Sequence, residues 1–469
     1  DWCATDDNPV IPGPMNRHRK RLRPFPGICR SRRSANVAAT PEESVRVQAL
    51  PTLTKDIVLV GGGHSHALLL RCLGMAPLAG ARLTLINPGL TAPYSGMLPG
   101  HIAGHYPMQS LQIDLHRLAR FAGARMVDGR AVALDRGAGA VVVDCADGET
   151  RRVGYDIASL DVGVTSDMPQ IEGFAEHAVP AKPLDAFAAR WEAFVADPGP
   201  AQVVVIGAGV AGVELAMAAH HRLSAAGQAP DVSLVEAGTA LAALGGSARA
   251  RLFEELRQKD IRLLENAPVT RVEAGAVVLQ DGRRLEAGFI VGAGGARPHG
   301  WLSETGLAHE RGFIRVGRDL RSITDPGIFA VGDCAHMEAS PRPKAGVFAV
   351  RAAPVLHDNL RAALSGGARR AFKPQRHYLK LISLGGKAAV AERNGLALGG
   401  ALLWRWKDRI DQKFMDGLDD LPAMKTDALA GPLASGVQEA LAGKPLCGGC
   451  GAKLGGAVLG DLLAEVQPS

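Results

Sequence analysis

The chain has 469 residues, 47% of them apolar, and this length can bury the cores of roughly three domains of about 150 residues each. Its 57 glycines follow no G-X-Y period, which excludes collagen, and no uninterrupted apolar run reaches the roughly 18 residues that a membrane span needs. The net charge of +6 permits an anionic partner, but the charge is unevenly spread along the chain.

Residues 1–53 are predicted to form a disordered basic leader. Residues 15–41 contain eight Lys and Arg and no Asp or Glu, which is typical of a transit peptide or a disordered arm. A nucleic-acid-binding arm is the less favoured alternative, and we expect no nucleic-acid partner. The seven scattered cysteines form no disulfide framework, which favours a reducing compartment. We therefore expect the cytoplasm, or an organelle matrix if the leader is a transit peptide.

The first Gly-rich stretch, VGGGHSHALLLR at residues 60–71, follows an apolar strand and opens a predicted helix. Gly61 and Gly63 occupy two positions of a dinucleotide-binding loop, but His66 replaces its third glycine and should displace the helix or point sideways. The next strand ends at Asn87, where an acid is usual. His64 and His66 do not face one another on a helix, and no Cys, Asp or Glu set lies nearby, so we predict no metal.

The second Gly-rich stretch is a complete G-x-G-x-x-G after the strand VVVI, formed by Gly207, Gly209 and Gly212. The first glycine makes the turn, the second admits a diphosphate, and the third lets the helix pack on the strand. Glu236 ends the following strand and suits a ribose 2′-hydroxyl. A carboxylate there repels a 2′-phosphate, so NADH is favoured over NADPH.

Downstream, residues 327–335 (GIFAVGDCA) and 161–163 (DVG) complete a pattern that resembles the two-dinucleotide-binding flavoproteins, which include the pyridine nucleotide-disulphide oxidoreductases and type II NADH dehydrogenases. The resemblance implies an α/β fold with two Rossmann-like dinucleotide-binding domains, for FAD and NAD, and a small α+β C-terminal lobe. It implies FAD on the first unit and NADH on the second. The implied FAD contacts are Gly61, Gly63, His64, Asn87, Gly163, Gly332 and Asp333.

The resemblance also implies that the NAD unit is inserted within the FAD domain. The expected segments are 54–169 and 287–365 for FAD, 170–286 for NAD(P)H, 366–425 for the lobe and 426–445 for a linker. Residues 446–469 include LCGGCGAK and resemble the start of selenophosphate synthetase (selenide, water dikinase), with Cys450 as the reactive thiol and Lys453 as a phosphate contact. Residues 92–104 (APYSGMLPGHIAG), 159–163 (SLDVG) and 342–364 likewise resemble the flavoprotein module fused ahead of that kinase.

The electron acceptor is the least determined part of the predicted reaction. Residues 93–107, where disulphide reductases carry a C-x-x-x-x-C pair, contain no cysteine. The glutamines of type II NADH dehydrogenases align with Val347 and Arg351, which weakens the case for a quinone. Lys344 and Arg351 are candidates to stabilise reduced flavin or to attract a selenium or sulfur oxyanion. The alternative is a Lys at a helix N-terminus and a surface Arg.

Residues 396–415 contain two tryptophans and several bases, as a helix on a membrane surface would, but interleaved acids favour packing of the lobe or a homodimer contact. The predicted function is an FAD-dependent NADH oxidoreductase that passes electrons to a small acceptor. Two alternatives stay open: the leading fragment of a bifunctional selenide, water dikinase, and a non-catalytic flavin-bound docking module for such a kinase.

Overall fold

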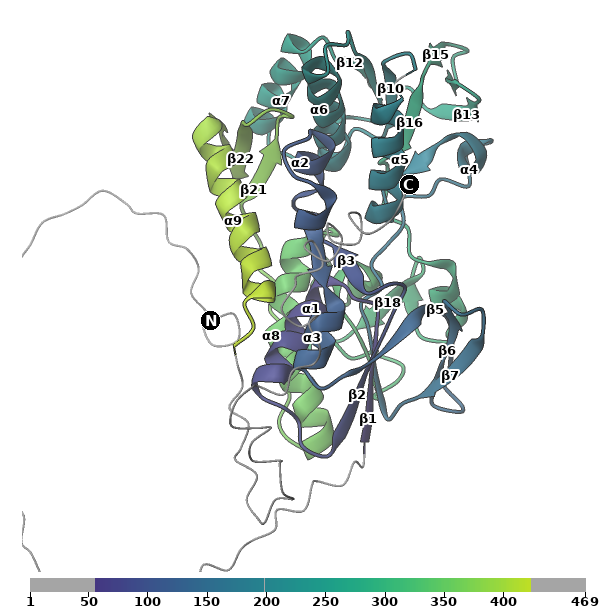
Figure 1. The fold of residues 1–469 in the computed structure, drawn as a ribbon, viewed down its shortest axis with the longest axis vertical. Helices are drawn as coiled ribbons and strands as arrows, with labels where there is room; N and C mark the ends of the chain where they lie inside the picture. The colour runs from purple at the N-terminus through teal and green to yellow at the C-terminus, as the bar shows by residue number, and fades with distance from the viewer. Residues whose placement is uncertain (1–54, 198, 423–469) are drawn as a thin grey trace, which may run out of the picture. The chain divides into compact units, whose positions relative to one another are not determined.

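The computed structural model describes residues 55–197 and 199–422, and the structural statements below concern these residues (Figure 1). The predicted leader, linker and kinase-like segment lie outside them. No helix in the described part combines the length and the apolar character that a membrane span requires.

The first sheet has seven strands in the order β19-β8-β1-β2-β5-β6-β7. Its central strands run parallel, and β6 and β7 add an antiparallel edge. The last four residues of β1 are fully buried, as expected for a parallel strand covered on both faces. The strands are β1 (Lys55–Val60), β2 (Ala81–Asn87), β5 (Arg125–Asp135), β6 (Ala140–Cys145), β7 (Thr150–Gly154), β8 (Ile157–Leu160) and β19 (Ile328–Ala330).

Helix α1 (His64–Met75) packs between α3 (Leu115–Phe121) and α8 (Gly346–Ser365). In Figure 1, α8 (green) lies beside α1 (purple) although the two are far apart in sequence. Because helices cover α1 on several sides, its sequence is apolar around most of its circumference and most of its residues are buried.

The second sheet has five parallel strands in the order β12-β11-β10-β16-β9. The strands are β9 (Val179–Pro180), β10 (Gln202–Ile206), β11 (Asp231–Val235), β12 (Arg262–Leu264) and β16 (Phe289–Gly292), with helices α5 (Leu184–Ala196), α6 (Val210–Ala225) and α7 (Gly246–Gln258). Since β16 pairs with β10, we propose that the second unit extends to Gly292 rather than to the expected boundary at 286.

The C-terminal lobe consists of the antiparallel strands β21 (Lys380–Ser383), β22 (Ala389–Arg393) and β23 (Leu396–Gly400) followed by α9 (Ala401–Asp419). The segment 396–415 is thus part strand and part helix. The lobe packs against α6 and α7 of the second unit and against α1 of the first. One face of α9 is buried through Asp411, Phe414, Met415 and Leu418. The predicted α/β fold with two Rossmann-type sheets and a small α+β lobe is confirmed.

Shorter elements complete the described chain. They are β3 (Thr91–Pro93), α2 (Leu98–Ile102), β4 (Gln112–Asp114), α4 (Phe174–His177), β13 (Val269–Glu273), β14 (Ala276–Leu279), β15 (Arg284–Glu286), β17 (His309–Glu310), β18 (Phe313–Val316), β20 (Ala335–Met337) and the 3-10 turns Met108–Leu111, Gly300–Glu304 and Gly332–Cys334.

Candidate functional site

Two loops of the same design connect β1 to α1 and β10 to α6. Gly61 and Gly207 follow the strands with φ of +90° and +106°, values that favour glycine. The helices then begin at His64 and Val210, so each loop leads into a helix N-terminus beyond the carboxyl end of a parallel strand. Open α/β sheets bind ligands at this end of their strands.

A side chain at the end of the second strand of each unit holds its loop. The Asn87 Oδ1 atom accepts a hydrogen bond from the Gly62 amide at 2.8 Å, and the Glu236 Oε2 atom accepts one from the Ala208 amide at 2.8 Å. The Asn87 amide group also donates to the Pro88, Gly89 and Thr91 carbonyls. Asn87, a predicted FAD contact, and Glu236, the predicted ribose contact, therefore also position the Gly-rich loops.

The second loop has room for a ligand at its middle glycine and none at its third. A Cβ added to Gly209 would meet no atom within 4 Å, whereas one added to Gly212 would lie 1.8 Å from the Gly207 carbonyl oxygen. Among the described residues, the amides of Gly209, Val210 and Ala211 have no hydrogen-bond partner. The helix N-terminus of α6 thus presents free donors beside open space, as a diphosphate site requires.

His66, at the position of the missing third glycine, points sideways. Its ring contacts Gly61 of the first loop and Ser159 of β8. Its Nδ1 lies 2.7 Å from the Gly61 carbonyl oxygen and its Nε2 lies 2.8 Å from the Ser159 hydroxyl. Because the carbonyl can only accept, Nδ1 carries the hydrogen and Nε2 accepts from Ser159. Burial lowers the pKa of His66 to about 4, so the imidazole is neutral.

His64 is half-buried, and its partial removal from solvent lowers its pKa to about 4. Its ring meets Tyr94 edge-on at a centroid distance of 5.3 Å and Phe414 of α9 at 6.0 Å. Tyr94 and Phe414 stack on each other at 4.6 Å. The C-terminal lobe therefore contacts the start of α1 through an aromatic cluster of His64, Tyr94 and Phe414.

The Gly332-Asp333 turn lies next to the first loop, beyond the end of β19. Asp333 forms an ion pair with Lys182 at 3.0 Å, and the Asp333 charge acts on His64. Lys182 follows β9 of the second unit, so this pair links the two units. Gly163 has a φ of +65°, and a Cβ added there would meet no atom within 4 Å. Sequence reasoning missed Lys182, because no local pattern distinguishes it.

Asp161 is a second residue that sequence reasoning left without a role. It follows β8 and is 3% exposed, and its Oδ2 atom accepts hydrogen bonds from the amides of Ser65 at 2.9 Å and His66 at 3.2 Å. Its backbone carbonyl accepts from the Gly63 amide at 3.2 Å. The sequence signal was its place in the DVG segment, but only the pairing of β8 with β1 brings it to α1.

The four residues expected to be catalytic have different surroundings. Lys344 donates to the Ala335 carbonyl at 2.5 Å, its ammonium lies 4.0 Å from the centre of the Phe313 ring, and burial lowers its pKa. Arg351 is exposed on α8. Cys450 and Lys453 lie outside the described residues.

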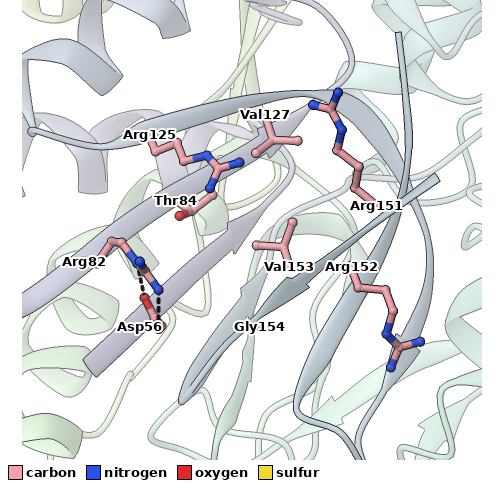
Figure 2. Close-up of a pocket in the computed structure, with 9 residues that line it drawn as sticks. All are labelled: Asp56, Arg82, Thr84, Arg125, Val127, Arg151, Arg152, Val153 and Gly154. Atoms are coloured by element: carbon pink, nitrogen blue, oxygen red, sulfur yellow. Dashed lines mark hydrogen bonds and ion pairs between the residues drawn. The ribbon is translucent and has the colours of Figure 1, made fainter. Parts of the chain in front are cut away.

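A cavity of about 470 Å³ lies at the opposite end of the first sheet (Figure 2). Four arginines line it, and three of them are paired: Arg82 with Asp56, Arg151 with Asp147 and Glu149, and Arg152 with Asp135. Asp56 and Arg82 stand at the starts of the parallel strands β1 and β2, whereas both Gly-rich loops follow the ends of their strands. This cavity is therefore separate from the candidate site.

Comparison with known proteins agrees with this geometry. Residues 55–353 match the pyridine nucleotide-disulphide oxidoreductase family. The chain belongs to this family. It is an FAD-dependent NAD(P)H oxidoreductase, and the predicted cofactors, FAD and NADH, are confirmed.

Among relatives, a "Nitric oxide reductase FlRd-NAD(+) reductase" of Pectobacterium atrosepticum is 30% identical over 302 residues, which cover 61% of this chain and 73% of that protein. A "Type II NADH:quinone oxidoreductase" of Haemophilus influenzae is 31% identical over 153 residues, which cover 30% of this chain and 34% of that protein. The fold is similar to that of NDH2 from Plasmodium falciparum, with a TM-score of 0.66 and 14% identity over 79% of this chain and 100% of that one.

The Glu236 carboxylate should determine which nicotinamide nucleotide this oxidoreductase prefers. We expect Glu236→Gln to raise the ratio of kcat/KM for NADPH to that for NADH by about 10-fold to 100-fold, because a charge-assisted hydrogen bond to the 2′-hydroxyl contributes about 1.5–3 kcal/mol. Steady-state kinetics with both nucleotides measures the ratio. Glu265→Gln is a matched control, since Glu265 likewise accepts a backbone amide, that of Ala240. An equal rise in both variants would contradict the assignment.

Removing the His66 imidazole should destabilise the fold in a pH-dependent way. At pH 7.5, His66→Ala should lower the free energy of unfolding by about 2–4 kcal/mol, through a cavity and two lost hydrogen bonds. Because the folded pKa of about 4 is below the ordinary 6.5, the unfolded chain takes up the proton first as pH falls. The difference from wild type should therefore shrink by up to about 1.4 kcal/mol per pH unit between pH 6.5 and 4. Urea titrations across this window measure it; a constant difference would show that folded His66 protonates as readily as unfolded His66.

Proposed function

We propose that this oxidoreductase binds FAD at the first loop and NADH at the second, and passes a hydride from NADH to FAD and electrons onward to a small acceptor. The observation that carries the proposal is the matched construction of the two loops, each with a left-handed first glycine, a following helix and a tether from the second strand. The FAD contacts are Gly61, Gly63, His64, Asn87, Gly163, Gly332 and Asp333, and the NADH contacts are Gly207, Gly209, Gly212 and Glu236.

Bound FAD supplies the hydride and electron chemistry, and the chain supplies orientation and a dry, charged setting. The free amides of α6 bind the NADH diphosphate, and Glu236 accepts from the ribose. Lys182 holds the Asp333 carboxylate in place for the flavin side chain. His64, Tyr94 and Phe414 form the aromatic contact between the lobe and the start of α1.

The two free cysteines, Cys145 and Cys334, support an acceptor other than a redox-active disulphide beside the flavin. The Cys334 thiol is fully buried beside the Gly-Asp turn, and burial raises its pKa to about 12, so it stays protonated. Cys145 is buried in β6. Residues 93–107 contain no cysteine. We therefore propose a diffusible acceptor, either a quinone or a selenium or sulfur compound.

A stopped-flow experiment tests this function. The purified protein should be yellow, and NADH should bleach it under anaerobic conditions; if it does not, the proposed direction of transfer fails. The reduced protein is then mixed with quinones, oxygen, and oxidised selenium or sulfur compounds. The acceptor is the compound that reoxidises it fastest at equal concentration. Bleaching by NADH would also exclude a purely docking role.

A link to selenium metabolism is the second candidate. It rests on LCGGCGAK at residues 446–453 and on the resemblance to a module fused ahead of selenophosphate synthetase. If the chain forms part of a bifunctional selenide, water dikinase, the native full-length protein should consume ATP only when selenide is present, and Cys450→Ala should abolish this. ATP use unaffected by selenide would remove this candidate.

A further inference from the structure

Asp161 occupies the anion position at the N-terminus of α1. In α6, the amides at the start of the helix are free, whereas in α1 those of Ser65 and His66 already bind the Asp161 Oδ2 atom. Of the first-turn amides of α1, only that of His64 lacks a partner among the described residues. The two loops therefore have similar backbones but different electrostatic surroundings, because the N-terminus of α1 binds the Asp161 carboxyl group and that of α6 binds no side-chain carboxyl group among the described residues.

The Asp161 carboxyl group also lies between two proposed FAD contacts. A Cβ added to Gly63 would lie 2.4 Å from Asp161 Cγ, and one added to Gly332 would lie 2.3 Å from Asp161 Oδ1. Gly63 is the residue that caps α1, and Gly332 belongs to the Gly-Asp turn. A Cβ added to Gly63 would also lie 2.5 Å from both Asp161 carboxyl oxygens, so a diphosphate that contacts both segments meets this carboxyl group, whose Oδ1 atom is the oxygen that does not bind the helix amides.

In the part of the chain that the structure describes, no cationic side chain pairs with Asp161. Its neighbours from α1 are His64 and His66, both neutral; those from the Gly-Asp turn are the Asp333 carboxylate and the protonated Cys334 thiol. Lys182 is paired with Asp333, and within residues 55–197 and 199–422 no Lys or Arg forms an ion pair with Asp161. Lys344 acts on Asp333 and Cys334 rather than on Asp161, so an ionised Asp161 carboxylate would repel a diphosphate.

We propose that Asp161 binds the FAD diphosphate in its protonated form, donating its carboxyl hydrogen to a phosphate oxygen, so that FAD binding takes up a proton from solvent wherever the free carboxyl group is ionised. This inference rests on the proposed placement of FAD at the first loop. The proton neutralises the carboxylate, no other bond forms or breaks, and the helix amides keep their acceptor. Burial is the main cause that raises the pKa of Asp161 to about 7, so protonation near neutral pH is accessible before FAD arrives.

Isothermal titration calorimetry of flavin-free protein with FAD tests the inference. Titrations at pH 8 in phosphate and in Tris, whose ionisation enthalpies differ, give the number of protons taken up per FAD. We expect nearly one for wild type and nearly none for Asp161→Asn. By linkage, the wild-type Kd for FAD should rise up to about tenfold per pH unit above pH 7. A Kd that is constant between pH 7 and 9 would overturn the proposal without any variant.

Glu214→Gln is the matched control. Glu214 is also a buried carboxyl whose pKa burial raises to about 7, but it lies on α6 and accepts from the Ser383 amide. This variant should take up as many protons as wild type. If Asp161→Asn keeps the uptake, another group such as His64 gains the proton and the inference is wrong. If FAD binds without proton uptake, the inference fails while the placement of FAD stands; retention of FAD by Gly63→Val would instead refute the placement.

Discussion

Gly209→Val should give a folded, yellow protein that NADH can no longer reduce. The added side chain begins in space where no protein atom lies within 4 Å, so we expect the free energy of unfolding to change by no more than about 0.5 kcal/mol. It would nevertheless occupy the space beside the free amides of α6. We expect kcat/KM for NADH to fall at least about a hundredfold, since a misplacement of about 1 Å costs that much. Anaerobic stopped-flow absorbance of the flavin measures the loss.

The control for Gly209→Val is Gly246→Val, because Gly246 also begins a helix and also has no atom within 4 Å of an added Cβ. That variant should be reduced by NADH at the wild-type rate. Dithionite should bleach both proteins, which shows that the flavin itself remains reducible. Wild-type reduction of Gly209→Val by NADH would show that the nucleotide does not pass over this loop.

Gly63→Val should have the opposite effect to Gly209→Val: the variant should bind NADH but retain no FAD. A Cβ on Gly63 would lie 2.4 Å from the Asp161 Cγ atom, which is too close for the buried carboxyl to keep its bonds to the Ser65 and His66 amides. The first loop must then shift, and its diphosphate site is lost. The measurement is the flavin-to-protein absorbance ratio of the purified protein, which we expect to fall from near one flavin per chain to almost none.

Measuring NADH binding to Gly63→Val distinguishes a local loss of the FAD site from unfolding of the whole protein. The second loop belongs to a different sheet, so the Kd of Gly63→Val for NADH should stay within about threefold of wild type, which corresponds to less than about 0.7 kcal/mol. Full flavin occupancy in Gly63→Val would contradict the assignment of the first loop to FAD. Loss of NADH binding as well would mean that the substitution disrupts the fold.

The Gly-rich loops were predictable because their information is local. The apolar strand, the glycine with positive φ and the start of the helix can all be recognised from residue types within about a dozen positions. The same holds for Asn87 and Glu236, which stand at the ends of the next strands. Family resemblance then supplied the long-range step, that the Gly-Asp segment near residue 332 returns to the first sheet, and β19 does pair with β8.

The roles of Asp161, Lys182 and His66 could not be read from the sequence. Asp161 meets α1 across 96 positions of chain, and Lys182 meets Asp333 across 151. The sequence predicted that His66 would displace the helix or point sideways, but not that its ring would form hydrogen bonds to Gly61 and Ser159. The anion-binding role of Lys344 stays a prediction, and the sequence did not indicate that its ammonium also donates to the Ala335 carbonyl.

By itself, the sequence predicted two Gly-rich loops that each follow a buried strand, a glutamate at the end of the strand after the second loop, and no cysteine in residues 93–107. These properties depend on residue types a few positions apart, where backbone geometry leaves little choice. Only the tertiary structure decided that a carboxyl group fills the N-terminus of one helix and not of the other, and that an ion pair joins the two units. Such contacts depend on which strand ends lie side by side, and parallel pairing brings together residues that no local spacing connects.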